Sequence, residues 1–560
     1  LSWMIILVDW VNSPSFDDCA ICVVLFGTTM SAPSMSYRAV RWVAKEVSET
    51  WFREHGAIET DNIPETGGVL FAAWHPGSLI DPLLMISTLP GQITFIAKHT
   101  LFKVPILGRI MKAAGARPIY RSIDKEHIQG DRKKGNQAVI ETVADILVDQ
   151  GNCVIFPEGV SHLSSQPERV KTGPARMLLL AIRRAREQGV PEPVIVPIGL
   201  HYSDPNRFRE RALVEVHSPM EIPPLPGEPG APSASNEMID EFGLEEANDR
   251  AWVNYVTDDL GGELQRTSHG LESWEDRKLL WRARGLVSVH RNRLAGRSHR
   301  ASFQEAVLGA RRMRAAWLHM MEIDPERANQ LRSKVEMHSK IMQSYGLSEY
   351  ELYDRNKRPG PLSMISASIQ FLWCWIWMLG LITWSALIGS YPPYRFAGPI
   401  AAKSAENEPY ALGTKKIAVA FMLLPIWWFL ISFPVAWLLA GASSPVWQLL
   451  EQGALGFLKP SVTSIPWFLL AFIIMPLWSV GARLHLRLWQ RSVRSMHTLR
   501  RWFRLRDGSV PWQELSESQI ELAKILDSIG KSLVLPGDSD WVDPPSGEDD
   551  HVMVRVRSTS

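Results

Sequence analysis

The sequence predicts an α/β domain with a mostly parallel sheet flanked by helices, followed by a helical arm and C-terminal transmembrane helices. Between residues 68 and 222, apolar runs of strand length alternate with longer stretches of helical period, which is typical of parallel strands joined by helices. Between residues 361 and 482, three long stretches carry no charged side chain, and each is long enough to cross a membrane. A chain of 560 residues is also too long for one ordinary domain.

Composition narrows the classes of function. Lys and Arg number 60 against 59 Asp and Glu, so the net charge of +1 argues against a nucleic-acid-binding protein. Many of the 23 tryptophans lie in the late apolar stretches, as is typical of membrane interfaces. The four cysteines are scattered, which predicts a reducing compartment without a disulfide framework. Cys19 and Cys22 have C-x-x-C spacing but no second pair, so no metal or redox site is assigned to them.

The N-terminal part leaves two questions open. Residues 1–34 lack the basic start and long apolar core of a signal peptide, and Met35 is a more natural beginning. We expect this extension to be a fragment's remnant or an upstream extension, with an apolar anchor as the alternative. Residues 37–56 predict an amphipathic helix, which either packs on the following domain or lies on a membrane surface.

Six strands and two clear helices are expected in the first domain. The strands are 68–73, 92–97, 117–120, 152–156, 193–200 and 212–217, and the helices are 132–150 and 174–188. In open parallel sheets, functional sites collect in the turns beyond the carboxyl ends of the strands. We therefore examine the polar residues that follow these strands.

Changes in composition divide the chain into segments. The predicted segments are an extension at 1–34, the α/β domain at 35–222, a Pro/Gly/Ser-rich linker at 223–236, a helical arm at 237–360, a transmembrane region at 361–482, a basic helical segment at 483–530 and a disordered tail at 531–560.

The basic flanks of the transmembrane region predict its orientation. The apolar stretches are 362–390, 417–440 and 464–482. Lys357 and Arg358 precede them and a run of arginines follows them, so the positive-inside tendency places both flanks, and the α/β domain, in the cytoplasm. That orientation needs an even number of crossings. Either Pro425 and Pro434 make the second stretch re-entrant, or residues 444–458 add a fourth pass.

A histidine and an aspartate follow the first strand. The strand 68–73 runs into Trp74-His75-Pro76-Gly77-Ser78-Leu79-Ile80-Asp81, where proline and glycine begin a turn. A carboxylate on one imidazole nitrogen would leave the other nitrogen as a base for a substrate hydroxyl. The alternative is a helix-capping Asp81 beside an unrelated His75, and these residues alone leave the two interpretations equal.

Three further stretches lie in or beside other predicted strands. Residues 115–121 contain Arg117 and Arg121, whose guanidinium donors match phosphate oxygens. The second stretch is Phe156-Pro157-Glu158-Gly159 with Ser161, and Lys171 follows soon after it. The third is Val196-Pro197-Ile198-Gly199-Leu200-His201, a buried strand that ends near the same edge. Together they predict one polar site at the carboxyl edge of the sheet.

In this order, the four stretches resemble the ordered blocks of the glycerolipid acyltransferase superfamily, and the resemblance covers residues 68–202. The helical arm and the C-terminal helices resemble those of its fungal-type glycerol-3-phosphate/dihydroxyacetone-phosphate branch. Five residues separate His75 from Asp81 here, where the usual pattern has four. The longer spacing agrees with the fungal-type branch, and Pro76 and Gly77 offer a turn that absorbs the extra residue.

The resemblance implies a glycerol-3-phosphate acyltransferase-like fold and a membrane-bound O-acyltransferase of phospholipid biosynthesis. His75 would be the general base and Asp81 its partner. The residues implied for acceptor and phosphate binding are Arg121, Lys171, Glu158, Gly159, Ser161 and, more weakly, Arg117. Glu158 would bond the glycerol or orient a basic residue.

The partners implied by the resemblance are an acyl thioester donor, acyl-CoA or acyl-carrier protein, a glycerol phosphate acceptor and membrane lipids, with no cofactor. A lysophosphatidate or other lysophospholipid acceptor is the alternative within this class. A non-catalytic membrane scaffold that retains the fold is the alternative outside it.

Two other chemistries are disfavoured by the sequence. A metal site could draw on His75, Asp81, Glu158, His162 and His201, but the chain contains no H-E-x-x-H motif, so no metal is assigned. Ser78 does not lie in a G-x-S-x-G elbow, which argues against a hydrolase. We interpret His162 and His201 as structural histidines.

Overall fold

The computed structural model falls into two compact units. It describes residues 33–103, 105–113, 115–119, 129–297, 301–353, 361–441, 443–450, 459–504, 510–536, 538–539, 541 and 555–556. One unit contains the described residues from 33 to 353 and those from 512 onward, and the other contains the described residues between 361 and 511. Each unit is described by itself below.

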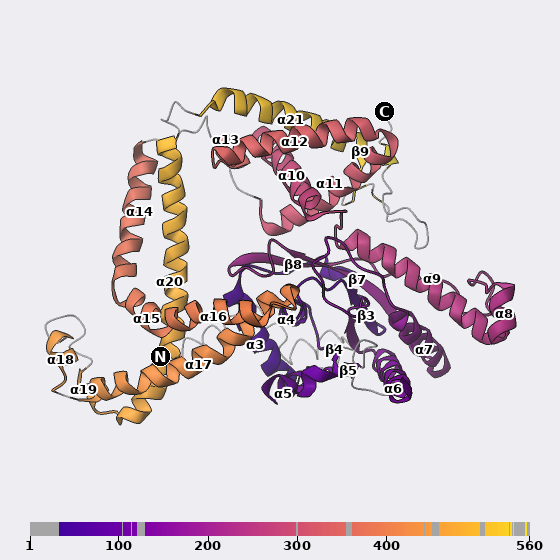
Figure 1. Ribbon diagram of the computed structural model, residues 1–560, viewed down its shortest axis with the longest axis horizontal. Helices are drawn as coiled ribbons and strands as arrows, with labels where there is room; N and C mark the ends of the chain where they lie inside the picture. Colours follow the sequence, from indigo (N-terminus) through magenta and orange to yellow (C-terminus); the bar gives the residue numbers. More distant parts are fainter. Residues whose placement is uncertain are drawn as a thin grey trace, which may run out of the picture. The chain divides into compact units, whose positions relative to one another are not determined.

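An eight-stranded, mostly parallel sheet lies in the described part of the first unit (Figure 1). Its strands are β1 (Phe52–Glu54), β2 (Ala57–Ile58), β3 (Val69–Ala73), β4 (Ile93–Lys98), β5 (Arg117–Ile119), β6 (Asn152–Ile155), β7 (Val194–Tyr202) and β8 (Glu210–Val216). The order is β1-β8-β7-β3-β6-β4-β5, with β2 also on β8. Every pairing is parallel except that of β7 with β8. The predicted fold class is confirmed.

All six predicted strands are present, with boundaries shifted by one or two residues. The strand predicted at 193–200 continues to Tyr202, which brings His201 and Tyr202 into the sheet. β1 and β2 were not expected, because three and two residues are too few to show an alternating pattern. The helix predicted at 37–56 is α3 (Met35–Trp51), and it ends where the chain enters β1.

The central strands are hydrophobic because helices cover both faces of the sheet. Every residue of β3 and of β6 is buried. On one face lie α6 (Gln129–Val148), α7 (Gly173–Gln188) and α9 (Leu244–Thr267) (Figure 1). Their side chains, including Val143, Leu178 and Leu264, form the largest described core cluster with β3 and β6. Burial of each such side chain stabilises the fold by about 1.5–3 kcal/mol. Because apolar side chains fill the layers, polar residues are found at the ends of the strands.

The remaining elements of this unit are mostly helical. They are η2 (Thr60–Asn62), α4 (Ile80–Thr88), η3 (His99–Lys103), α5 (Pro105–Ala113), α8 (Asn236–Phe242), α10 (Trp274–Leu294), α11 (Phe303–Ile323), α12 (Pro325–Ser344), α13 (Glu349–Tyr353), α21 (Trp512–Ser532), β9 (Leu533–Val534) and β10 (Arg555–Val556). α3 packs on α4 and α5. α9 packs on α7 and β7, and α11 packs on β8, so helices of the predicted arm contribute directly to the layers of the α/β domain. α21 packs on α10, α12 and α13.

The second unit is helical. Its elements are α14 (Pro361–Leu379), α15 (Leu381–Gly389), α16 (Tyr391–Ser404), η5 (Pro409–Ala411), α17 (Leu412–Ala440), α18 (Pro445–Leu450), α19 (Lys459–Thr463) and α20 (Trp467–Arg504). In the described residues, two segments are long and apolar enough to cross a membrane, Pro409–Ala440 and Trp467–Arg500. A third crossing results if Met364–Met378 and Ile382–Ser404, bent by 54°, form one span.

Two details bear on the number of crossings. Pro425 and Pro434 lie inside the continuous helix α17, so they do not break the second apolar stretch. Within 444–458, the helix α18 has six residues, and residues 451–458 lie outside the described part of the chain. Large apolar side chains such as Trp373, Met422 and Phe472 are exposed on these helices, as expected for surfaces that contact lipid.

Candidate active site

His75 and Asp81 form a hydrogen-bonded pair. His75 lies two residues beyond β3, and Asp81 lies in the first turn of α4. His75 Nδ1 is 2.8 Å from Asp81 Oδ2, so the carboxylate reaches the ring across five intervening residues. The connecting turn places Ser78 at a φ of 57° and joins the Ile80 amide to the Gly77 carbonyl at 3.2 Å. This left-handed residue absorbs the additional length.

Asp81 is held on both carboxylate oxygens. The Gly77 amide donates to Oδ2 at 2.8 Å, and the Tyr202 hydroxyl donates to Oδ1 at 2.6 Å. A Cβ on Gly77 would overlap this carboxylate, so glycine is needed at that position. Burial, and then the charge of Asp81, raise the pKa of Tyr202 well above its usual value, which keeps the phenol protonated as a donor.

These contacts fix the chemistry available to His75. An ionised carboxylate only accepts hydrogen bonds, so Nδ1 of His75 carries the proton that Asp81 Oδ2 receives. Nε2 of the neutral ring then holds a lone pair. The ring stacks on Phe156, with ring centroids 4.0 Å apart and planes inclined by 18°, which fixes its orientation. Because Asp81 is fully buried and the His75 side chain is 18% exposed, the pair can present Nε2 to a substrate.

Glu158 connects the carboxyl ends of β6 and β3 through a hydrogen bond. It follows β6 and is buried. Its Oε1 accepts from the His75 backbone amide at 3.0 Å, and its Oε2 accepts from the Glu168 amide at 3.0 Å and from the His162 ring. Both oxygens of Glu158 are therefore engaged by protein donors, and the basic residue that it orients is His162.

His162 completes this buried connection. Its Nδ1 accepts from the Ser164 amide at 3.2 Å, so its Nε2 carries the proton donated to Glu158. Burial lowers the pKa of His162, but the hydrogen bond and charge of Glu158, helped by Glu168 and Asp81, raise it overall. The interpretation of His162 as a structural histidine agrees with these contacts.

Gly159 and Lys171 lie together beside this turn. Gly159 has a φ of 72°, and a Cβ built on it would lie 2.5 Å from Lys171 Nζ. The Lys171 amide donates to the Pro157 carbonyl at 3.0 Å, which holds the lysine against the turn. Ser161 is partly exposed on the same loop. The absence of a side chain at Gly159 thus makes room for an ammonium group next to the Glu158 turn.

The two arginines are placed differently. Arg121 lies outside the described residues. Arg117 is exposed and begins β5, paired with Ile96 of β4. β5 is three positions from β3 in the sheet, and strands lie about 4.8 Å apart. Arg117 is thus about 14 Å to the side of the strand that leads to His75, so the structure does not bring it to the pair.

Sequence reasoning missed Tyr202 and gave no role to Phe156. Tyr202 lies 121 residues from Asp81 in the sequence and meets it only because β7 pairs with β3. The available signal was its place directly after His201 at the end of a buried strand. Phe156 was predicted only as the last residue of the strand 152–156, whereas its ring is the surface on which His75 stacks.

Replacing Tyr202 by phenylalanine is expected to lower turnover about tenfold. The change removes the donor to Asp81 Oδ1, and a hydrogen bond to a charged group contributes about 1.5–3 kcal/mol. Steady-state kinetics of the purified full chain measure this, with the more exposed Tyr255 changed to phenylalanine as the matched control. Turnover within twofold of the unchanged protein would contradict a positioning role for Tyr202.

Comparisons with known proteins match the region that contains this site. Residues 57–201 match the family described as Acyltransferase. An uncharacterized acyltransferase of Schizosaccharomyces pombe is 22% identical over 267 residues, 33% of this chain and 39% of that protein. Glycerol-3-phosphate O-acyltransferases 1 and 2 of Saccharomyces cerevisiae are 42% and 37% identical over 73 and 90 residues.

The alignments are partial. They cover 13% and 16% of this chain and 9% and 12% of the two Saccharomyces cerevisiae proteins, so less than half of each curated relative is matched. Among solved structures, the 1-acyl-sn-glycerophosphate acyltransferase PlsC of Thermotoga maritima is 17% identical with a TM-score of 0.24, covering 46% of this chain and 95% of that one.

Proposed function

We propose that this chain transfers a fatty acyl group from an acyl thioester to a hydroxyl of glycerol 3-phosphate or dihydroxyacetone phosphate. The match of residues 57–201 to the Acyltransferase family and the two Saccharomyces cerevisiae relatives support this proposal. The observation that carries this proposal is the 2.8 Å contact between His75 Nδ1 and a buried Asp81 oxygen, which leaves Nε2 as a base. The two Saccharomyces cerevisiae relatives favour a glycerol phosphate acceptor over a lysophospholipid.

The reaction needs a base and a means of offsetting the charge that the base gains. Nε2 of His75 takes the proton of the acceptor hydroxyl while the hydroxyl oxygen attacks the thioester carbonyl. Asp81 stabilises the resulting imidazolium through Nδ1. When the carbon–sulfur bond breaks, the imidazolium returns the proton to the thiolate that leaves. The ester forms directly, so no side chain of the protein is acylated, and no cofactor takes part.

Acceptor binding is assigned to the basic and small residues around the pair. Lys171 would contact the phosphate across Gly159, and Ser161 would lie at the wall of the same pocket. Arg121 is proposed as the second phosphate ligand, since a guanidinium offers paired donors to phosphate oxygens. Glu158 acts by holding His75 and His162 rather than by contacting the acceptor.

The apolar helices suit a reaction whose donor and product carry a long acyl chain that partitions into lipid. Among the described residues, two segments are long and apolar enough to span a membrane, which supports membrane association. We propose that the acyltransferase domain faces the cytoplasm. The arginine-rich second half of α20 supports this orientation, because Arg491, Arg494 and Arg500 follow the apolar part of that helix.

The decisive test is an acceptor panel. Membranes containing the full chain are incubated with labelled acyl-CoA and glycerol 3-phosphate, dihydroxyacetone phosphate or lysophosphatidate, and the products are separated by thin-layer chromatography. Product from either of the first two acceptors is expected. Product from lysophosphatidate alone would replace the proposal by a lysophospholipid acyltransferase. The absence of product with every acceptor, whether the donor is acyl-CoA or acyl-carrier protein, would favour the non-catalytic scaffold.

Replacing Arg121 by alanine is expected to raise the KM for the phosphorylated acceptor about tenfold and to change turnover less. Charge-assisted hydrogen bonds to an anion contribute about 1.5–3 kcal/mol to binding. Kinetics at varied acceptor and fixed acyl-CoA measure the change, and Arg117→Ala is the matched control. An unchanged KM with lost turnover would argue against a phosphate-binding role for Arg121.

A further inference from the structure

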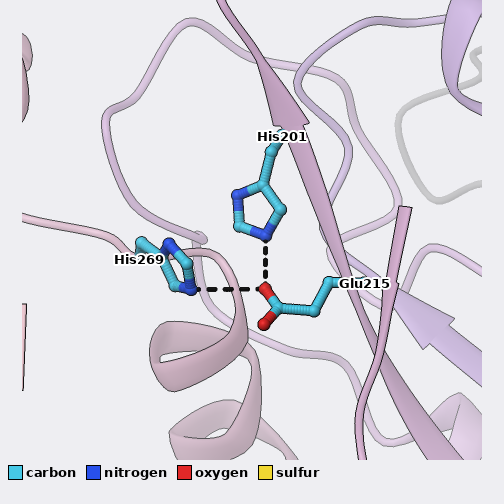
Figure 2. Close-up of side chains that lie close together, drawn as sticks. All are labelled: His201, Glu215 and His269. Carbon is cyan, nitrogen blue, oxygen red and sulfur yellow. Dashed lines mark hydrogen bonds and ion pairs between the residues drawn. The ribbon is translucent and has the colours of Figure 1, made fainter. Parts of the chain in front are cut away.

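A second cluster of ionisable side chains lies in the same unit, separate from the His75–Asp81 pair. His201 is on β7, Glu215 is on β8, and His269 lies in the loop between α9 and α10 (Figure 2). The three side chains are 0%, 0% and 2% exposed. Adjacent residues of a strand point to opposite faces, so His201 points away from the face on which Tyr202 meets Asp81. The proposed acyl transfer therefore does not use these residues.

The side chains converge on one carboxylate oxygen. His201 Nε2 is 2.7 Å and His269 Nε2 is 3.3 Å from Glu215 Oε2. The dashed lines in Figure 2 mark these two contacts. The three ligand atoms lie within 4.8 Å of one another. His217 Nε2 is a further donor atom, 3.5 Å from the same oxygen. Two or three imidazole nitrogens around one carboxylate oxygen are the donor set of zinc sites in proteins.

His269 has no hydrogen-bonding role that accounts for its position. Among the described residues, Nδ1 makes no hydrogen bond, and the contact of Nε2 is the 3.3 Å ion pair with Glu215, although the side chain is buried. A buried, unpartnered polar group costs about 1–3 kcal/mol. The residue also adopts a φ of 53°, which is uncommon for a side chain other than glycine. A zinc ion at Nε2 would give this nitrogen a partner at about 2.1 Å, closer than the carboxylate oxygen at 3.3 Å.

The residues around Glu215 pack closely on the cluster and divide the two carboxylate oxygens between an arginine and the histidines. Gly199 pairs with Glu215 across the two strands, and a Cβ on Gly199 would lie 2.7 Å from His201 Nε2. Arg311 donates to Glu215 Oε1 at 2.9 Å, which leaves Oε2 for the cluster. Arg311 also pairs with Glu59. Arg277, which is also buried, is a second positive charge that acts on His201 and His269, so two arginines balance the two carboxylates around the cluster.

We propose that His201, Glu215 and His269 bind a zinc ion that joins β7, β8 and the loop after α9. A donor set of two imidazole nitrogens and one carboxylate oxygen favours zinc over magnesium or calcium, which take mostly oxygen ligands. A buried site suits a structural ion, and it would fix the end of β7 that carries Tyr202.

The metal content of the purified full chain tests this proposal. The chain is produced without a polyhistidine tag, exposed to zinc, freed of loosely bound metal, and analysed by mass spectrometry for zinc. We expect about one zinc per chain. His269→Cys retains a zinc ligand and should keep the metal. His269→Ser introduces a side chain close in size to cysteine, and its bound zinc per chain should fall at least about tenfold. His290→Ala is the control at a buried histidine elsewhere.

A chelator provides a second readout that does not depend on acyl transfer. Removing zinc should lower the unfolding temperature of the unchanged protein and of His269→Cys, but not that of His269→Ser, because only a bound ion stabilises the folded state. Less than about one zinc per ten chains after zinc exposure, or equal zinc in the Cys and Ser variants, would overturn the proposal. The cluster would then be a hydrogen-bonded network around Glu215.

Discussion

Replacing His75 by alanine is expected to lower turnover about 100- to 10,000-fold. The ring is the base in the proposed reaction, and no other described imidazole contacts Asp81. Folding should change little, because Asp81 keeps its bonds from Gly77 and Tyr202 and the His75 side chain is partly exposed. The measurement is the rate of acyl transfer to glycerol 3-phosphate by purified full-length protein, together with its unfolding temperature.

A second variant separates the base from its partner. Asp81→Asn keeps the size of the side chain but offers an amide that no longer offsets the charge on the imidazolium. Its loss of turnover should fall within the same range as that of His75→Ala, and the double variant should be little worse than either, because the two residues act as one unit. Near-normal turnover of His75→Ala in folded protein would overturn the proposed mechanism.

The sequence located the pair but could not establish that its members meet. The strand, the turn residues and the start of a helix are local features, and local patterns predict them. Whether Asp81 reaches the His75 ring depends on the left-handed backbone at Ser78 and on the lack of a side chain at Gly77. Serine is not the residue that signals a left-handed conformation, so this turn could not be predicted in detail.

Contacts between distant parts of the chain were the main gap. Tyr202 and Asp81 are 121 residues apart, and the His75 amide and Glu158 are 83 apart. Strand order sets these neighbours, and hydrophobic periodicity does not specify strand order. The same reason explains why Glu215 and His269 were not connected with His201 when metal ligands were considered.

The helices show a similar gap. An amphipathic pattern tells that one face of a helix is covered, but not which element covers it. α9 belongs to a predicted helical arm, yet it covers the sheet. The predicted basic segment 483–530 is divided between α20, which continues an apolar stretch, and α21, which packs against α10.

Replacing Glu158 by glutamine is expected to lower both stability and turnover, the latter at least about tenfold. Three donors meet the two oxygens of Glu158, from the His75 amide, the Glu168 amide and the His162 ring. A glutamine amide has one oxygen, and its NH₂ group would face a donor in either orientation. Each buried group left unpaired costs about 1–3 kcal/mol, and the His75 backbone loses an anchor.

The pH dependence of this loss identifies its cause. Glu158 contributes to raising the pKa of His162 in the folded state above its unfolded value of about 6.5. The resulting stabilisation is fully present below the unfolded pKa and is lost as the pH rises through the folded pKa. The difference in unfolding temperature between the unchanged protein and Glu158→Gln should therefore be larger at about pH 6 than at about pH 9.

Glu187→Gln, at an exposed position on α7, is the control. A difference that is independent of pH would mean that Glu158 stabilises the fold only through hydrogen bonds from uncharged donors. The charge on His162 would then have no part in joining the ends of β3 and β6.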